Sequence, residues 1–94
     1  MFYDSYRWRL LRRFMLWLYG AKCMRCGSTH HIEVDHIIAR ARLNAPRSPF
    51  RVSQWSPRNL QVLCHECNRG KMVNFADYRP LWARVMMRVR DLRR

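Results

Sequence analysis

Four cysteines, arranged as two matching pairs, constrain the fold of this chain more than any other feature of its sequence. Cys23 and Cys26 form one Cys-x-x-Cys pair, and Cys64 and Cys67 form the other. A gap of two residues lets both thiolates of a pair reach one tetrahedral ion, and Gly27 permits the tight turn behind the second sulfur. The sequence therefore predicts a structural four-cysteine Zn²⁺ site in preference to disulfides or free thiols.

The segment between the two pairs spans residues 27–63, which is longer than the loop of a simple zinc ribbon. We therefore expect further elements to be inserted between the two halves of the zinc site. His30, His31 and His65 lie close enough in sequence to replace a ligand. Because four cysteines already complete a tetrahedral shell, we expect these histidines at the surface or in turns.

A chain of 94 residues is expected to form one small domain whose core is limited, and chains of this size often need a metal to stabilise them. The formal net charge is +13, and 19 residues are basic; Lys22 and Lys71 are the two lysines, so 17 are arginines. Arginine binds phosphate through a bidentate fork, so the composition indicates an anionic polymer as partner. A ribosomal-type RNA binder and a membrane-surface protein are the alternatives, and the cysteine framework disfavours the membrane.

No segment is long enough to span a bilayer. The apolar run 14–19 has only six residues and Lys22 follows closely, so we do not expect a secretory signal peptide. The expected location is the cytoplasm, which for a phage protein is that of the host cell. Paired cysteines there bind metal more often than they form disulfides. The sequence carries no signal for a particular oligomeric state.

The chain between these motifs alternates between periodic and irregular segments. Residues 4–19 read as a helix that Asp4 or Ser5 can cap and Gly20 ends. Its expected core face consists of Leu10, Leu11, Phe14, Trp17 and Leu18. Short strands are expected at 32–38 and 60–63, and helices at about 65–75 and 80–93. The apolar stripe of the last helix, expected to contact the core or a partner, consists of Trp82, Val85, Met86, Val89 and Leu92.

Val34-Asp35-His36-Ile37 places a carboxylate and an imidazole side by side between the two cysteine pairs. Carboxylate oxygen is a suitable ligand for a divalent metal, and a neutral His accepts a proton near pH 7. Metal-assisted phosphodiester hydrolysis needs both of these roles. Neighbours in a straight strand point to opposite faces, so we expect Asp35 and His36 at a strand end where the backbone bends. In isolation, a turn Asp beside a surface His would be the better interpretation.

Basic side chains are interleaved with Phe50 and Trp55 in the irregular segment from Arg40 to Arg58. A DNA-contacting loop fits this charge, and a solvated loop is the alternative for each residue. Lys71, three residues after Asn68 in the helix expected at about 65–75, is a further candidate, with a solvated charge as its alternative. The expected DNA contacts are therefore Arg40, Arg42, Arg47, Arg51, Arg58 and Lys71.

Taken together, the residues from about Lys22 to Lys71 resemble the HNH endonuclease family. The shared elements are, in order, Cys-x-x-Cys-Gly, Val-Asp-His-Ile, Asn59-Leu60-Gln61 and Leu63-Cys64-x-x-Cys67-Asn68. The resemblance implies a small α+β, ββα-metal (His-Me finger) fold with a structural zinc. It also implies that His36 is the general base, that Asp35 is a ligand of the catalytic metal, and that Asn59 orients His36 and its loop.

The third letter of the motif is usually His, and here it is Asn68, so the chain looks like the H-N-N variant of phage recombination endonucleases. The resemblance implies that Asn68 supplies an oxygen to the catalytic metal. Oxygen ligands favour Mg²⁺ or Mn²⁺, with Zn²⁺ and Ni²⁺ as alternatives. We expect one domain, 1–94, with its core at about 22–75 and flanking helices at about 4–19 and 80–93.

The predicted function is metal-dependent hydrolysis of DNA, which the protein holds mainly through the phosphate backbone. A zinc-stapled module that binds nucleic acid without cutting it is the main alternative. The joint presence of Asp35, His36, Asn59 and Asn68 favours the nuclease. A protein that binds other proteins through its two flanking helices ranks third.

Overall fold

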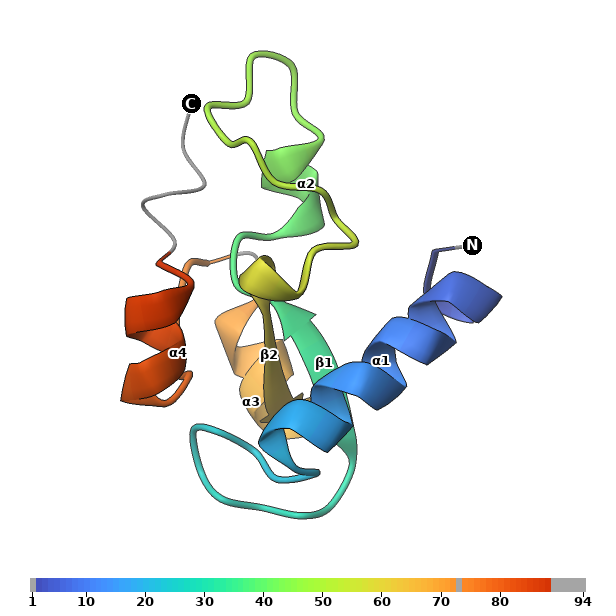
Figure 1. Ribbon diagram of the computed structural model, residues 1–94, viewed down its shortest axis with the longest axis vertical. Helices are drawn as coiled ribbons and strands as arrows, with labels where there is room; N and C mark the ends of the chain where they lie inside the picture. Colours follow the sequence, from blue (N-terminus) through green and yellow to red (C-terminus); the bar gives the residue numbers. More distant parts are fainter. Residues whose placement is uncertain (1, 73, 89–94) are drawn as a thin grey trace.

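The chain, seen here as a computed structural model, is described over residues 2–72 and 74–88. Two short strands and four α-helices are joined by loops and two 3₁₀ turns (Figure 1). In chain order they are η1 (Phe2–Asp4), α1 (Tyr6–Tyr19), β1 (Ile32–His36), α2 (Arg40–Leu43), η2 (Pro57–Asn59), β2 (Leu60–Cys64), α3 (His65–Lys71) and α4 (Leu81–Met86). None of the helices within these residues has the length and apolar character needed to cross a membrane.

The centre of the fold is an antiparallel pair of strands followed directly by a helix. β1 and β2 pair with Val34 opposite Val62 and Asp35 opposite Gln61. α1 and α3 lie on opposite faces of this sheet (Figure 1), α1 against Val34 and Leu60. Lys71 of α3 contacts Asp35 on the other face. This β–β–α order confirms the predicted small α+β fold with a ββα core.

α1 begins and ends where the sequence indicated, but it presents a different face to the core. The Ser5 hydroxyl accepts a hydrogen bond from the Trp8 N–H, and Gly20 ends the helix with a positive φ of 86°. Trp8 and Met15 are the buried residues of the helix, whereas Trp17, expected in the core, is 78% exposed. Leu10 and Phe14 are exposed too. The expected core face was wrong for these three residues, because both sides of the helix carry apolar residues at helical spacing.

The predicted strands are present as Ile32–His36 and Leu60–Cys64, and the two predicted later helices are present but end earlier than expected. α3 ends at Lys71, before the expected residue 75, and Met72 follows it with a positive φ of 53°. α4 ends at Met86, and the expected continuation over 89–93, with Val89 and Leu92, lies outside the described residues. Within α4 the apolar stripe is largely exposed; Trp82 stacks on Tyr19 with ring centroids 5.5 Å apart.

A buried arginine holds the segment before α4 against the sheet. The Arg79 side chain is fully buried and forms two hydrogen bonds to the Asp77 carboxylate. It also donates to the backbone carbonyls of Arg58 and Met87. A buried guanidinium needs both a counter-charge and full hydrogen bonding, and Arg79 has both. Arg79 therefore fixes α4 relative to the start of β2.

Candidate functional site

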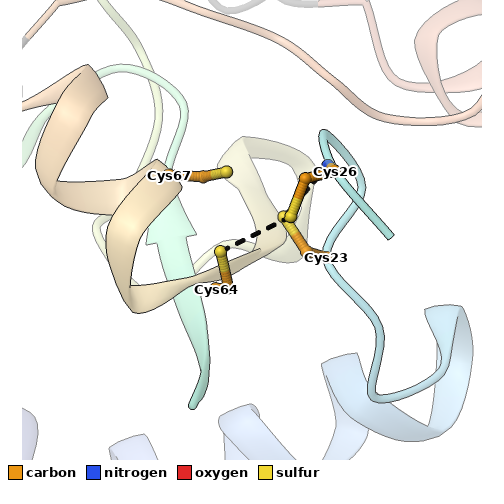
Figure 2. A group of neighbouring side chains, drawn as sticks. All are labelled: Cys23, Cys26, Cys64 and Cys67. Atoms are coloured by element: carbon orange, nitrogen blue, oxygen red, sulfur yellow. Dashed lines mark hydrogen bonds between the residues drawn. The ribbon is translucent and has the colours of Figure 1, made fainter. Parts of the chain in front are cut away.

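The four cysteines converge on one point between the loop after α1 and the junction of β2 with α3 (Figure 2). Their sulfur atoms all lie within 4.8 Å of one another, and the Cys26 and Cys64 sulfurs are 3.7 Å apart. Zn–S bonds of about 2.3 Å in a tetrahedron would place the sulfurs about 3.8 Å apart. All four cysteines are free, so the cluster suits a structural metal such as zinc, as the sequence predicted.

Backbone hydrogen bonds shape the first half of this cluster. The Gly27 N–H donates to the Cys23 carbonyl, and the Cys26 N–H donates to the Cys23 sulfur. The Met24 N–H donates to the Val62 carbonyl at 2.9 Å and so holds the turn against β2. His30, His31 and His65 are exposed and lie outside the cluster, in agreement with their expected surface positions.

The surroundings of the thiols shift the pKa values of Cys23 and Cys67 in opposite directions. Burial alone would raise the pKa of Cys23, but backbone N–H groups, led by that of Cys26, lower it to about 6. The hydrogen bond from Arg25 lowers the pKa of Cys67, but the Cys64 thiol and burial outweigh it and raise this pKa to about 12. The Cys23 thiolate therefore forms readily, whereas Cys67 resists deprotonation unless a metal supplies positive charge.

The Asp35 carboxylate lies at the end of β1 and is held from two sides. Its Oδ2 accepts a hydrogen bond from Gln61 Nε2 at 2.9 Å and lies 3.2 Å from Lys71 Nζ. Burial raises the pKa of Asp35, while Gln61 and Lys71 partly offset this by lowering it. Within the described part of the chain, no hydrogen bond reaches Oδ1. One oxygen is thus fixed by the protein and the other is left for a ligand.

The His36 ring is enclosed by aromatic side chains from the N-terminal segment. It stacks on Trp8 with centroids 5.5 Å apart and an interplanar angle of 16°, and Phe2 and Tyr3 lie at 5.7 and 6.3 Å. His36 Nε2 lies 2.8 Å from the Gln54 carbonyl oxygen. A carbonyl only accepts hydrogen bonds, so Nε2 carries the proton and Nδ1 carries the lone pair. Burial lowers the pKa of His36, which favours this neutral form.

Asn59 stabilises the loop that follows β1 and does not bond to the imidazole. Its side-chain oxygen accepts a hydrogen bond from the Ile38 N–H, and its amide donates to the Ile38 carbonyl. The Ile37 N–H donates to the Asn59 carbonyl at 2.9 Å. The structure thus places Asn59 where it fixes the backbone after His36, whereas Gln54 fixes the ring. Gln54 lies in an irregular loop and carried no sequence signal.

Glu33 is a second residue that sequence reasoning missed. It lies two positions before Asp35 on the same face of β1, and its Oε1 accepts a hydrogen bond from Asn68 Nδ2 at 2.8 Å. Its Oε2 lies 2.8 Å from His65 Nδ1. Burial would raise the pKa of Glu33, but the hydrogen bonds from Asn68 and His65 lower it. Since Nδ2 of Asn68 is occupied by Glu33, its Oδ1 is the atom left for a cation. The spacing of two residues from Asp35 was the available signal.

Asp35, His36 and Asn68 all line one cleft of about 520 Å³. Glu33 on β1, Arg40 and its neighbours on α2, and residues of the N-terminal segment complete the walls. The lining residues are Tyr3, Trp8, Arg12, Glu33, Val34, Asp35, His36, Ala39, Arg40, Ala41, Asn68 and Met72. The fold thus brings together the predicted base and both predicted metal ligands.

Of the six predicted DNA-contacting residues, four are exposed and two, Arg40 and Lys71, are engaged in contacts within the protein. Arg42, Arg47, Arg51 and Arg58 are exposed, and the loop after α2 extends away from the sheet (Figure 1). Arg40 is partly buried: its Nε donates to Gln54 Oε1, and its guanidinium stacks 3.9 Å from the centre of the Phe2 ring. Lys71 differs, because its side chain is 1% exposed and its ammonium bonds to Asp35 and the His36 carbonyl. This position favours a structural role for Lys71 over contact with DNA.

Comparison with known proteins agrees with this geometry. A family model described as HNH endonuclease matches residues 23–73, which is more than half of the chain and includes both cysteine pairs, β1, β2 and α3. No curated protein and no solved structure matches.

Proposed function

Because this chain belongs to the HNH endonuclease family, we propose that it is a metal-dependent endonuclease that hydrolyses phosphodiester bonds of DNA. One observation carries the proposal further than any other. The Gln54 carbonyl holds the His36 imidazole as the neutral tautomer with a free Nδ1, in the same cleft as Asp35 and Asn68. Burial lowers the pKa of His36, which is the direction a general base needs at neutral pH.

In the proposed reaction, His36 Nδ1 accepts a proton from the water that attacks phosphorus. The Trp8 ring and the Gln54 carbonyl hold the imidazole, so little reorganisation is needed when the proton moves. Asn59 keeps the following loop in place through its two bonds to Ile38. The exposed arginines of the loop after α2 contact the phosphate backbone without reading its sequence.

The donor set suits a hard divalent cation. Asp35 Oδ1 and Asn68 Oδ1 are the oxygens left unpaired by the contacts of Gln61, Lys71 and Glu33, and both residues line the cleft. Two oxygen ligands leave coordination positions for water and phosphate, as Mg²⁺ and Mn²⁺ prefer, and Zn²⁺ or Ni²⁺ are the alternatives. Such a cation would stabilise the negative charge that develops on the phosphate and the leaving oxygen.

Three further side chains, those of Glu33, Gln61 and Lys71, orient the proposed metal ligands. Each bonds to a proposed ligand: Glu33 to Asn68, and Gln61 and Lys71 to Asp35. Partners that fix a ligand's orientation commonly change metal affinity about 10- to 100-fold when they are removed.

Substitution of His36 tests the proposal against a binding module that does not cut. His36→Ala should retain zinc and DNA affinity, while plasmid cleavage in Mg²⁺ or Mn²⁺ should fall about 10²- to 10⁴-fold. His30→Ala, at an exposed position, is the matched control and should cleave like the wild type. Asp35→Ala should lose cleavage as well and recover part of it at higher metal concentration.

Equal cleavage by the wild type and His36→Ala, in zinc-loaded protein, would contradict the nuclease assignment. DNA binding without any cleavage in Mg²⁺, Mn²⁺, Zn²⁺ or Ni²⁺ would favour the binding module instead.

A further inference from the structure

The cleft has a wall that the HNH match does not include. Residues 23–73 match the family, yet Tyr3, Trp8 and Arg12 line the same cleft as Asp35 and His36. Trp8 and Arg12 lie on α1, one turn apart on the face that contacts the sheet. The N-terminal helix is therefore part of the proposed active site as well as part of the core.

Arg12 is held in this wall by a single backbone contact. It is partly buried, and its Nη2 donates a hydrogen bond to the carbonyl of Ile32, the first residue of β1, at 3.2 Å. No carboxylate forms an ion pair with Arg12 within the described residues. Its side chain nevertheless lines the same cleft as Glu33, Asp35 and His36. A guanidinium has five N–H donors, so most of them remain for a ligand.

The charge balance of the cleft indicates what that ligand is. Glu33 and Asp35 place two carboxylates in the walls, and these repel a phosphodiester. Arg12 and Arg40 are the basic residues among the lining side chains of the described chain. Arg40 is already engaged with Gln54 and stacked on Phe2. Arg12 has neither a carboxylate partner nor a stacked ring, so it is the better placed of the two to bind an oxyanion.

We propose that Arg12 binds the scissile phosphodiester through its guanidinium and stabilises the charge that builds on the phosphate during hydrolysis. This inference rests on the proposed nuclease function and assigns that site a residue from outside the family match. The Ile32 carbonyl fixes one end of the guanidinium, so the fork is oriented before DNA binds. Oriented donors stabilise the more highly charged phosphate of the transition state more than that of the ground state. Arg12 should therefore contribute mainly to kcat.

Arg12→Gln separates this role from a structural one, because glutamine keeps a polar side chain with N–H donors but carries no charge. Arg13→Gln is the matched control: the neighbouring residue is exposed and the change in net charge is the same. The measurements are single-turnover cleavage at saturating DNA with Mg²⁺, DNA affinity, zinc content and Tm. Arg12→Gln should cleave about 10²-fold more slowly with unchanged zinc. Arg13→Gln should keep the wild-type rate constant and lose only a little affinity.

Three further outcomes are decisive. If His36→Ala loses cleavage but Arg12→Gln cleaves like Arg13→Gln, the inference is overturned while the nuclease function stands. If His36→Ala cleaves like the wild type, the proposed function itself fails. If Arg12→Gln is poorly folded, Arg12→Lys replaces it in the same assay, because an ammonium keeps the charge but does not reproduce the guanidinium fork. A wild-type rate constant from any folded Arg12 variant overturns the inference.

Discussion

Gln61 lies directly opposite Asp35 in the β1–β2 pair, and its side-chain amide donates a 2.9 Å hydrogen bond to the Asp35 carboxylate. The same amide nitrogen donates to the Ala76 carbonyl, and the Gln61 oxygen accepts a hydrogen bond from the Tyr78 N–H. Gln61 is fully buried. It therefore connects the proposed metal ligand to the segment after α3, and a change at Gln61 should affect both.

Gln61→Leu should weaken the proposed catalytic metal site and the fold together. It removes one of the two partners of Asp35 Oδ2 and leaves the Tyr78 N–H unsatisfied, which costs roughly 1–3 kcal/mol of unfolding free energy per buried group. The Mg²⁺ concentration for half-maximal cleavage should rise about 10- to 100-fold. Urea unfolding and metal titration of cleavage measure the two effects. An unchanged metal dependence in a folded Gln61→Leu protein would show that Asp35 needs no support from Gln61.

The pH dependence of cleavage should report the burial of His36. Protonated imidazole cannot accept a proton, so the rate should fall as pH drops through the pKa of His36. Burial lowers this pKa from its ordinary value of 6.5, so the fall should occur below pH 6.5. A single-turnover pH profile at saturating metal measures it. A rate that already falls above pH 7 would mean that the base is not a buried neutral histidine.

Metal content tests the cysteine cluster. About one zinc should bind tightly per chain, and Cys64→Ser should lose it and largely unfold, because binding of a structural zinc is coupled to folding. His30→Ala, an exposed histidine near the first pair, should keep its zinc and its far-UV circular dichroism. A well-folded wild-type protein with four reactive thiols and no metal would refute this expectation.

DNA affinity should depend steeply on salt, because each phosphate contact releases counterions. Arg42 and Arg51 are exposed, so the double change to Glu should weaken binding to all sequences alike and reduce the salt dependence. Arg40→Glu should also reduce Tm, since Arg40 contacts Gln54 and Phe2. Fluorescence anisotropy on two unrelated duplexes, from 50 to 200 mM salt, is the measurement. Loss of affinity on one duplex alone would indicate base readout instead.

Arg79→Ala should destabilise the chain strongly, because it leaves the Asp77 carboxylate without its partner and removes bonds to two carbonyls. Breaking a buried ion pair costs about 3–5 kcal/mol of unfolding free energy. Arg84→Ala, on the exposed side of α4, should change it by less than about 0.5 kcal/mol. Chemical denaturation compares the two; similar midpoints would show that Arg79 does not anchor α4.

Elements whose signals are local could be predicted from the amino-acid sequence alone. Two Cys-x-x-Cys pairs predicted the metal cluster, because a two-residue gap lets both thiolates of a pair reach one ion whatever the rest of the fold is. Ser5 and Gly20 predicted the ends of α1 through capping. The Val-Asp-His-Ile segment predicted that Asp35 and His36 lie at a strand end, and β1 ends at His36, two residues before the expected position 38.

Which side chains meet across these elements depends on how the elements pack, and the local patterns of the sequence do not contain this information. α1 has apolar residues on both sides, so its sequence did not show that Trp8 and Met15, and not Trp17, face the sheet. His36 bonds to the backbone carbonyl of Gln54. Because every residue has a backbone carbonyl, the sequence could not show that Gln54 is the partner. Glu33 and Lys71 look like surface charges until β1 and α3 bring Glu33 beside Asn68 and Lys71 beside Asp35. The buried Lys71 ammonium needs the Asp35 carboxylate as its counter-charge.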